Sequence, residues 1–320
     1  MKTIGAIVLA LVVALAGLVL AARAGAFRLS LDELKARYER PESKYFGIGG
    51  LSIHYHDEGA GPAVLLVHGS FSTLRTWDPM VAALKDRYRL IRFDLPGFGL
   101  TGGDMMNPAA RELSAAGIAY ELLKSLGVEK VSCVGTSSGG TICNSFIAAH
   151  PEIAERLVIS NAPSAPVNIP RAQRPPAVRV QMLLCDDILN FRTPWFWRTY
   201  YDYLWGEPAR LTDDLLKKYY DFNRRAVEQI PRNLVPAGAS NNAEAAMPQV
   251  RVPTLIIWGM DDPVLPPAML DNLAAKMANA PKEIVRLERV GHYPILEVPD
   301  EFTRLADAFL SRPLAAAPAQ

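Results

Sequence analysis

The chain has 320 residues, half of them hydrophobic, and a formal net charge of +1. This length can bury a full core in one large domain with an insertion or in two domains. The near-neutral charge, without any block of Lys or Arg, excludes an electrostatic case for nucleic-acid binding. Among three cysteines there is no C-x-x-C pair, so no zinc site is predicted, and burial as small apolar residues is expected for Cys133 and Cys143.

The N-terminus begins with an apolar segment, because residues 4–22 include no charged side chain. That stretch is long enough to cross the hydrocarbon core of a bilayer. Cleavage as a signal peptide is the alternative, since Ala22-Arg23-Ala24 has the A-x-A form. Lys2 favours a cytoplasmic N-terminus, although Arg23 and Arg28 weaken that bias. The prediction is a membrane-anchored protein with its main domain on the periplasmic or extracellular side, or else a secreted one.

The rest of the chain alternates strands with helices after a linker over residues 27–43, which includes an amphipathic helix. Strands are predicted at 45–48, 51–57, 63–67, 89–93, 130–134, 157–160, 254–258 and 283–287. Helices are predicted at 77–85, 109–126, 141–149 and 267–277, with a last helix ending at 310. This alternation indicates a mostly parallel eight-stranded sheet flanked by helices, with the first hairpin as its antiparallel edge.

A helical insertion over residues 163–247 interrupts the alternation, which divides the core into 44–162 and 248–312 and leaves a tail at 313–320. The insertion is rich in aromatic residues between Phe191 and Phe222. Such a segment, which returns to the sheet, is interpreted as a cap over the strand ends. Most of its aromatic side chains should form its own core. The others should make the substrate pocket apolar.

Gly135-Thr136-Ser137-Ser138-Gly139 lies between a predicted strand and a predicted helix and has the G-x-S-x-G pattern of a nucleophile elbow. The turn is so tight that positions two before and two after the serine must be small, and the serine backbone is strained. Centring the pattern on Ser138 would place Thr136 at a position that should be small. Ser137 is therefore the predicted nucleophile.

A serine nucleophile needs a base, and the base needs an acid to orient it. His292 follows a strand on a loop, so it is the predicted base. The remaining histidines are assigned other roles: His54 and His56 as exposed or edge residues, His68 as a packing residue, and His150 as a helix C-cap. The acid should follow the strand at 254–258, where Asp261 and Asp262 cannot be separated by spacing alone.

These motifs resemble the α/β-hydrolase superfamily, in its capped branch of esterases, carbon–carbon hydrolases and haloperoxidase-like enzymes. The resemblance covers about residues 45–310 without the cap. It is based on His68-Gly69-Ser70, residues 94–99, the elbow, residues 258–262 and Gly291-His292.

The resemblance implies the α/β-hydrolase fold and favours Asp262 as the acid. It assigns the oxyanion hole to the backbone N–H groups of Ser70 and Ser138, and it gives Asp94 a structural role. One departure is Ser138 itself, where relatives usually have a larger apolar residue. A serine nucleophile also excludes the activities of haloalkane dehalogenases and epoxide hydrolases, because those members of the fold form an alkyl-ester intermediate on an aspartate.

The expected function is hydrolysis of an ester or related acyl bond in a small apolar substrate through Ser137, Asp262 and His292, with no metal or cofactor. Hydrolysis of a carbon–carbon bond in a vinylogous diketone by the same triad is the alternative. A catalytically silent ligand-binding protein of this fold is a third, weaker interpretation. The sequence indicates no oligomeric state.

Overall fold

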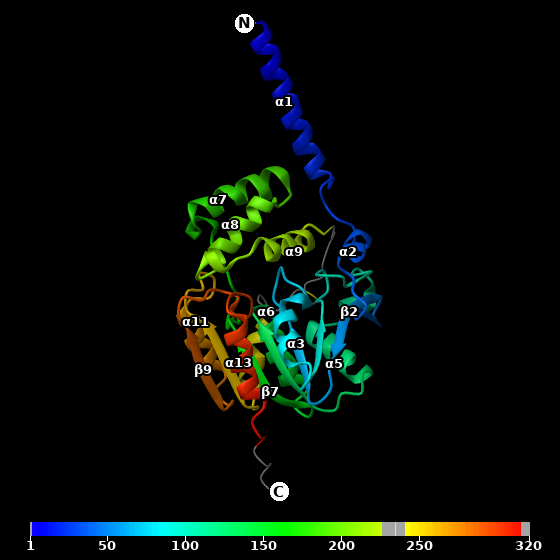
Figure 1. Ribbon diagram of the computed structural model, residues 1–320, viewed down its shortest axis with the longest axis vertical. Helices are drawn as coiled ribbons and strands as arrows, with labels where there is room; N and C mark the ends of the chain where they lie inside the picture. The colour runs from blue at the N-terminus through cyan, green and yellow to red at the C-terminus, as the bar shows by residue number, and fades with distance from the viewer. Residues whose placement is uncertain (1, 226–233, 235–240, 315–320) are drawn as a thin grey trace.

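A nine-stranded sheet forms the centre of the computed structural model, which describes residues 2–225, 234 and 241–314 (Figure 1). The strands are β1 (Lys44–Ile48), β2 (Leu51–Glu58), β3 (Ala63–Val67), β4 (Arg89–Phe93), β5 (Gly102–Gly103), β6 (Val131–Thr136), β7 (Ala154–Ser160), β8 (Thr254–Gly259) and β9 (Lys282–Leu287). The eight predicted strands are confirmed, and β5 is one that the sequence did not predict.

The strand order is β1-β2-β4-β3-β6-β7-β8-β9, with β5 paired to β2 off this path. Strand β2 runs antiparallel to β1, β4 and β5, whereas the pairs from β4 through β9 are parallel. The predicted antiparallel edge is therefore confirmed. The carboxyl ends of all the parallel strands lie on the same side of the sheet, which is where ligands bind in such folds.

Helices cover both faces of the sheet because the central strands are apolar on both sides. The helices α3 (Asp78–Leu84), α12 (Pro294–Glu297) and α13 (Pro299–Leu310) pack on the face that includes Val64 and Leu66. The helices α5 (Ala115–Ser125), α6 (Ser138–Ala149) and α11 (Pro267–Lys276) pack on the face that includes Leu65 and Val67. Alternate residues of β3 thus point into two separate cores.

Two details of the core differ from the sequence-based expectation. The helix predicted at 109–126 is two helices, α4 (Pro108–Arg111) and α5, because Ser114 caps α5 by accepting a hydrogen bond from the Gly117 N–H at 3.0 Å. Cys133 and Cys143 are not free apolar residues, since they form a disulfide between β6 and α6. Cys185 is the free cysteine, and it is buried.

Helices of the predicted cap lie above the carboxyl ends of the strands (Figure 1). They are α7 (Pro176–Met182), the π-helix η3 (Leu183–Leu189), α8 (Pro194–Leu204), the 3₁₀ turn η4 (Pro208–Arg210) and α9 (Asp213–Asn223). Most of their aromatic residues form a core of their own, which includes Phe196, Trp197, Tyr201 and Tyr219. Residues 226–233 and 235–240 of this segment, and 315–320 of the tail, lie outside the described residues.

The remaining helical segments are short and join these layers. They are α2 (Leu31–Tyr38), α10 (Asn241–Ala246), η1 (Leu74–Trp77), η2 (Arg171–Gln173) and η5 (Met247–Gln249). Helix α2 belongs to the predicted linker, and its capping box joins Ser30 to Glu33.

Helix α1 (Lys2–Arg23) projects away from the core on the side where α7 and α8 lie (Figure 1). Its 22 residues span about 33 Å at about 1.5 Å per residue, which matches the thickness of a hydrocarbon core. The mean hydropathy of its most apolar window is 2.9, and none of that window is buried. By length and composition α1 can cross a membrane, and a signal sequence meets the same criteria.

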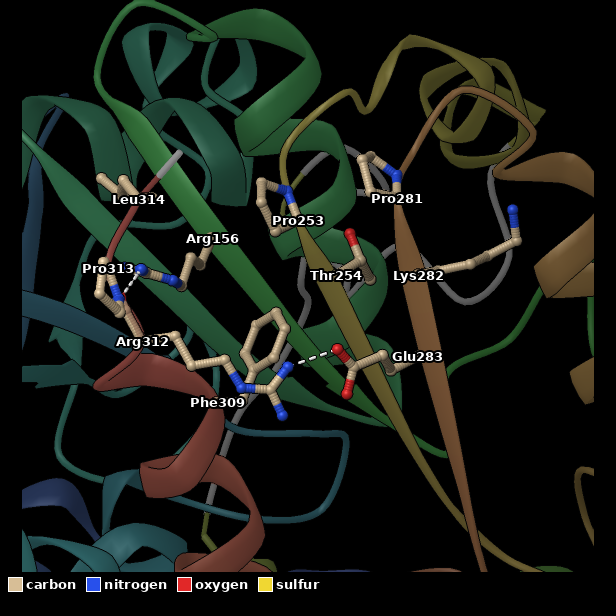
Figure 2. A pocket seen from close by; sticks show the side chains of 10 residues that line it. All are labelled: Arg156, Pro253, Thr254, Pro281, Lys282, Glu283, Phe309, Arg312, Pro313 and Leu314. Carbon is tan, nitrogen blue, oxygen red and sulfur yellow. Dashed lines mark hydrogen bonds and ion pairs between the residues drawn. The ribbon is translucent and has the colours of Figure 1, made fainter. Parts of the chain in front are cut away.

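A surface pocket of 260 Å³ opens at the amino ends of β8 and β9 (Figure 2). Its lining includes Glu283 and Arg312, which form an ion pair, and Arg156, which donates to the Arg312 carbonyl. Because Ser137 lies at the carboxyl end of β6, this pocket is at the opposite edge of the sheet from the elbow.

Candidate active site

The turn between β6 and α6 has the geometry of a nucleophile elbow. Strand β6 ends at Thr136 and α6 begins at Ser138, and between them Ser137 has φ +52° and ψ −130°. A Cβ on Gly135 would come within 2.5 Å of the Gly139 carbonyl oxygen, and one on Gly139 would overlap the Val67 carbonyl. The strained serine and the two small flanking positions are as the sequence predicted.

The structure brings Ser137, His292 and Asp262 into one hydrogen-bonded chain. The Ser137 Oγ lies 3.0 Å from the Nε2 of His292, and the His292 Nδ1 lies 2.6 Å from the Oδ2 of Asp262. All three side chains are largely buried. With Nδ1 donating to the carboxylate, Nε2 can accept the serine proton, which is the arrangement that activates a serine.

Asp262, rather than its neighbour Asp261, meets His292. Its Oδ1 accepts hydrogen bonds from the N–H groups of Val264 and Leu265 at 2.8 and 2.9 Å. Asp261 is exposed, and its backbone N–H donates to the Val290 carbonyl at 2.9 Å. Spacing left Asp261 and Asp262 as alternatives, and the turn after β8 directs the side chain of Asp262 towards His292.

The side chains of Ser70 and Ser138 meet beside the nucleophile. Their hydroxyl oxygens lie 3.1 Å apart, and a Cβ on Gly69 would lie only 2.8 Å from the Ser137 Cβ. Ser138 is the first residue of α6, so its N–H has no acceptor within the helix. Within the described ranges neither of these two N–H groups donates a backbone hydrogen bond. Both are thus available to an oxyanion.

The sequence predicted that His54 and His56 are exposed or edge residues, and this prediction is wrong because both are buried. His54 is buried, and its ring lies between Asp94 Oδ2 at 2.7 Å and Ser43 Oγ at 2.8 Å. His56 is also buried, with its Nε2 3.3 Å from the Ser43 hydroxyl. The linker residue Ser43 covers this face of β2, and alternation within one strand cannot reveal such a cover.

Asp94 organises the loops beneath the site without touching the triad. It accepts hydrogen bonds from the N–H groups of Leu74 at 2.7 Å and Leu100 at 2.8 Å. Burial alone would raise its pKa, but the hydrogen bond and charge of His54, the charge of His68 and the Leu100 N–H lower the pKa to about 2. The loop after β3 is thereby fixed, which is a structural role for Asp94.

His68 and His150 have the structural roles that the sequence predicted. The Nε2 of His68 accepts from the Leu95 N–H at 3.0 Å, and its Nδ1 lies 2.7 Å from the Gly69 carbonyl oxygen. Burial lowers the pKa of His68, which favours the neutral ring in this position. His150 caps the C-terminus of α6 and stacks on Tyr120, with ring centroids 3.7 Å apart.

Three positioning residues were missed by the sequence analysis. Asn161 donates from Nδ2 to Asp262 Oδ2 at 2.8 Å. The Tyr293 hydroxyl donates to the Ser70 carbonyl at 3.0 Å, and its ring packs edge-on against His292 at 4.7 Å. Glu297 accepts from the Gly291 N–H at 2.9 Å. The available signals were the polar residue directly after β7 and the aromatic residue directly after the predicted base, whereas Glu297 lies five residues beyond that base.

The side of the site that faces the cap is aromatic. Phe71, in the loop after β3, has φ +60°, and its carbonyl oxygen accepts from Asn223 Nδ2 at 2.7 Å and from the Tyr201 hydroxyl at 3.4 Å. Its ring packs edge-on against Trp197 at 5.8 Å. An apolar substrate group therefore finds aromatic surface close to the oxyanion loop.

Residues 2–225, 234 and 241–314 include no group of three or more His, Cys, Asp or Glu side chains that could hold a metal ion. The reaction of a serine–histidine–aspartate chain requires no such ion, because the histidine moves the proton and backbone N–H groups stabilise the charge.

Comparisons with known proteins agree with this geometry. A family model described as alpha/beta hydrolase fold matches residues 62–299, which is more than half of the chain. A 2-hydroxy-6-oxononadienedioate/2-hydroxy-6-oxononatrienedioate hydrolase from Paraburkholderia xenovorans (strain LB400) is 28% identical over 290 residues. That match covers 83% of this chain and 92% of the relative.

Two solved structures illustrate the likeness of the fold. A meta-cleavage product hydrolase from Pseudomonas fluorescens IP01 matches with a TM-score of 0.64 at 23% identity, over 83% of this chain and 97% of that one. A membrane phospholipase A matches with a TM-score of 0.62 at 23% identity, over 97% of this chain and 98% of that one.

Proposed function

Because this chain belongs to the α/β-hydrolase fold family, we propose that it is a serine hydrolase whose nucleophile is Ser137. The observation that carries the proposal is the continuous chain from Ser137 Oγ through both nitrogens of His292 to Asp262, with separations of 3.0 and 2.6 Å. Ser137 attacks a carbonyl carbon while His292 takes its proton. The N–H groups of Ser70 and Ser138 hold the oxyanion, each worth about 3 kcal/mol in the transition state.

The leaving group then receives the proton from His292, and an acyl-enzyme remains on Ser137. A water molecule, deprotonated by His292, attacks the acyl carbon, and the serine is released with a carboxylic acid as product. Asn161 and Tyr293 act as positioning residues in this scheme, since one holds the acid and the other holds the oxyanion loop.

The bond that we propose first is a carbon–carbon bond next to a ketone in a vinylogous diketone. The support is that the curated relatives, at 24–28% identity, are named 2-hydroxy-6-oxo-dienoate-type hydrolases. A 2-hydroxy-dienoate must first become its keto tautomer, in which the hydroxyl loses its proton and the carbon that will leave gains one. This carbon then departs as an enolate conjugated with the second carbonyl, and protonation of the enolate completes the cleavage. This order reverses our sequence-based expectation, in which the ester came first.

Hydrolysis of an apolar carboxylic ester is the second candidate, and a specific observation favours it. The structural match to a membrane phospholipase A extends over 97% of this chain, whereas the matches to solved carbon–carbon hydrolases cover 83–84%. The exposed apolar helix α1 and the aromatic cap are also compatible with a lipid-soluble ester.

We further propose that α1 remains in the protein as a membrane anchor, with the catalytic part outside the cytoplasm. The disulfide between Cys133 and Cys143 supports this orientation, because disulfides persist in oxidising compartments. For the ester candidate the proposed substrate is a small apolar molecule, whereas a 2-hydroxy-6-oxo-dienoate also carries a carboxylate. We also propose the boundaries given above for core, cap and linker as the domain organisation.

The experiment is a two-substrate assay on the full chain in detergent micelles. A 2-hydroxy-6-oxo-dienoate is compared with a series of aryl esters, and the larger kcat/KM identifies the bond. Ser137→Ala should lower either activity by at least about 10⁴-fold with no change in the unfolding midpoint. Ser145→Ala, further along α6, is the matched control and should retain activity.

Retained activity in Ser137→Ala would refute the nucleophile assignment. If wild type hydrolyses neither substrate and a fluorophosphonate fails to label Ser137, the chain is instead a ligand-binding protein of this fold.

A further inference from the structure

Large apolar side chains are exposed along the outer surface of the cap, on α7 and η3 and beside them. The exposed fractions are 53% for Val180, 51% for Leu183, 43% for Leu184, 42% for Ile188, 37% for Phe27 and 76% for Trp195. We call these six residues the cap patch. Isolated exposed apolar residues are ordinary on soluble proteins, but a grouped set indicates an interaction surface.

Helical spacing places three residues of the cap patch on one side of the α7–η3 segment. Val180, Leu184 and Ile188 follow one another at intervals of four residues, and all are exposed. Val178 and Cys185 on the opposite side are buried. A helix at the surface of a soluble protein would have polar residues on its outer side, so this segment has a second apolar side with no protein partner among the described residues.

The cap patch lies directly beside the end of the apolar helix α1. Arg23, the last residue of α1, donates to the backbone carbonyls of Asp187 and Ile188 at 3.2 and 3.0 Å. The Phe27 ring packs on Phe191 at 5.5 Å. In Figure 1 the lower end of α1 lies beside the end of the α7–η3 segment, in agreement with the contacts between α1 and η3. Where α1 leaves a bilayer, the cap patch therefore comes to the surface of that bilayer.

We propose that the cap patch rests in the interface of the phospholipid bilayer that α1 spans, an inference that depends on the proposed anchor. The surrounding charges suit this position. Asp186 and Asp187 are paired with Arg192 and Arg171, whereas Arg28 and Arg179 beside the patch have no acidic partner among the described residues. Such cations attract lipid phosphates, and tryptophan is enriched at the depth of the head groups. The patch would then lie about 5–10 Å below the surface, between head groups and acyl chains.

Docking would connect the bilayer to the catalytic loop through α8. This helix begins beside Trp195 in the cap patch and ends at Leu204, whose carbonyl accepts a hydrogen bond from the His292 N–H at 2.8 Å. Trp197 and Tyr201, on the inner side of the same helix, contact Phe71. Aromatic side chains of α8 therefore extend from the cap patch to the loop after β3.

The test uses the tryptophan emission of the full chain reconstituted in phosphatidylcholine vesicles whose acyl chains are brominated near the head group. Trp195 is 76% exposed, whereas Trp77, Trp197, Trp205 and Trp258 are at most 4% exposed. Bromine quenches on contact, so it should quench Trp195 selectively. In Trp195→Phe the remaining emission should be insensitive to bromine, which is the matched control.

The double variant Val180→Asp/Leu184→Asp tests whether the patch itself holds the cap down. It should reduce the bromine quenching of Trp195 at least about twofold, with hydrolysis of a water-soluble aryl ester or diketone unchanged. Equal emission in brominated and plain vesicles would overturn the proposal, as would full quenching in the double variant. If the cap patch does not dock but Ser137-dependent hydrolysis is intact, the docking proposal fails and the proposed function does not. The two proposals are therefore tested separately.

A second copy of the chain is the competing occupant of the patch. In that case Ile188→Cys would form a disulfide-linked dimer in vesicles at low protein density, and Trp195 would be shielded from bromine. That pair of results would also overturn the proposal.

Discussion

Asn161 offers the sharpest test of how the acid is positioned. Its side chain is fully buried, with Nδ2 donating to Asp262 Oδ2 at 2.8 Å and to the Gly259 carbonyl at 3.2 Å. Its Oδ1 accepts from the Gly259 N–H at 2.9 Å. One amide thus joins the ends of β7 and β8 and orients the carboxylate that faces His292.

Removal of this side chain should affect both catalysis and stability. A hydrogen bond to a charged group is worth about 1.5–3 kcal/mol, and loss of that much transition-state stabilisation lowers kcat about 10- to 100-fold. The KM should stay the same because Asn161 is predicted to act through Asp262 rather than on the substrate. The two bonds to Gly259 add about 1 kcal/mol each to the loss of unfolding free energy.

Two substitutions separate the side chain from the backbone strain. Asn161 has φ +41°, which glycine adopts freely and alanine does not. Asn161→Gly should therefore be more stable than Asn161→Ala, while both show the same fall in kcat. The matched control is Asn144→Ala on α6. Asn144 is equally buried but has no hydrogen-bond partner among the described residues, so its kcat should not change. A kcat for Asn161→Gly within twofold of wild type would refute the positioning role.

Three further predictions concern the scaffold. Because the folded pKa of Asp94 is about 2, below its ordinary value of 3.8, Asp94 contributes about 2 kcal/mol that is present above about pH 4 and lost as the pH falls towards 2. Asp94→Asn should lower the free energy of unfolding in urea at pH 7. It should also make that free energy depend less on pH below pH 4, and an unchanged pH dependence would contradict this. Cys143→Ser, or a reductant, should cost about 2–3 kcal/mol by opening a loop of 10 residues, which urea titration with and without reductant checks; equal titrations would contradict it. Gly139→Ala, whose Cβ would overlap a backbone carbonyl, should abolish folding by circular dichroism, whereas Gly47→Ala meets no atom within 4 Å and should be neutral; a folded Gly139→Ala would refute the close approach.

The strands and the elbow could be predicted because their signals are local. Residues 63–67 form an apolar run that suits a strand covered on both faces, and the structure places them in β3 at the centre of the sheet. The glycines around Ser137 are required by contacts within one turn. The ends of parallel strands then indicated Ser137, His292 and one of two aspartates, and the family resemblance favoured Asp262. The structure brings these three side chains together.

The features that were missed depend on contacts between distant segments. His54 is covered by the linker residue Ser43 and by Asp94 after β4, so its burial could not be read from β2 alone. The disulfide joins residues whose sulfur atoms meet only once α6 packs against β6. The choice of bond was also beyond the motifs, since the same triad serves an ester and a ketone. What distinguishes these two substrates is the group that stabilises the leaving fragment, and that group binds outside the triad.

Glu297 shows why the cap and the catalytic loop act as one unit. Its carboxylate accepts from the N–H groups of Gly206 and Glu207, just after α8, at 3.1 and 3.0 Å and from the Gly291 N–H at 2.9 Å. Burial raises its pKa, although these donors and Arg210 lower it. A buried carboxyl that joins the end of α8 to the loop of His292 transmits any displacement of the cap to the base. A change in the cap that selects a different substrate therefore also changes the position of the proton acceptor, so specificity and rate should vary together in this protein.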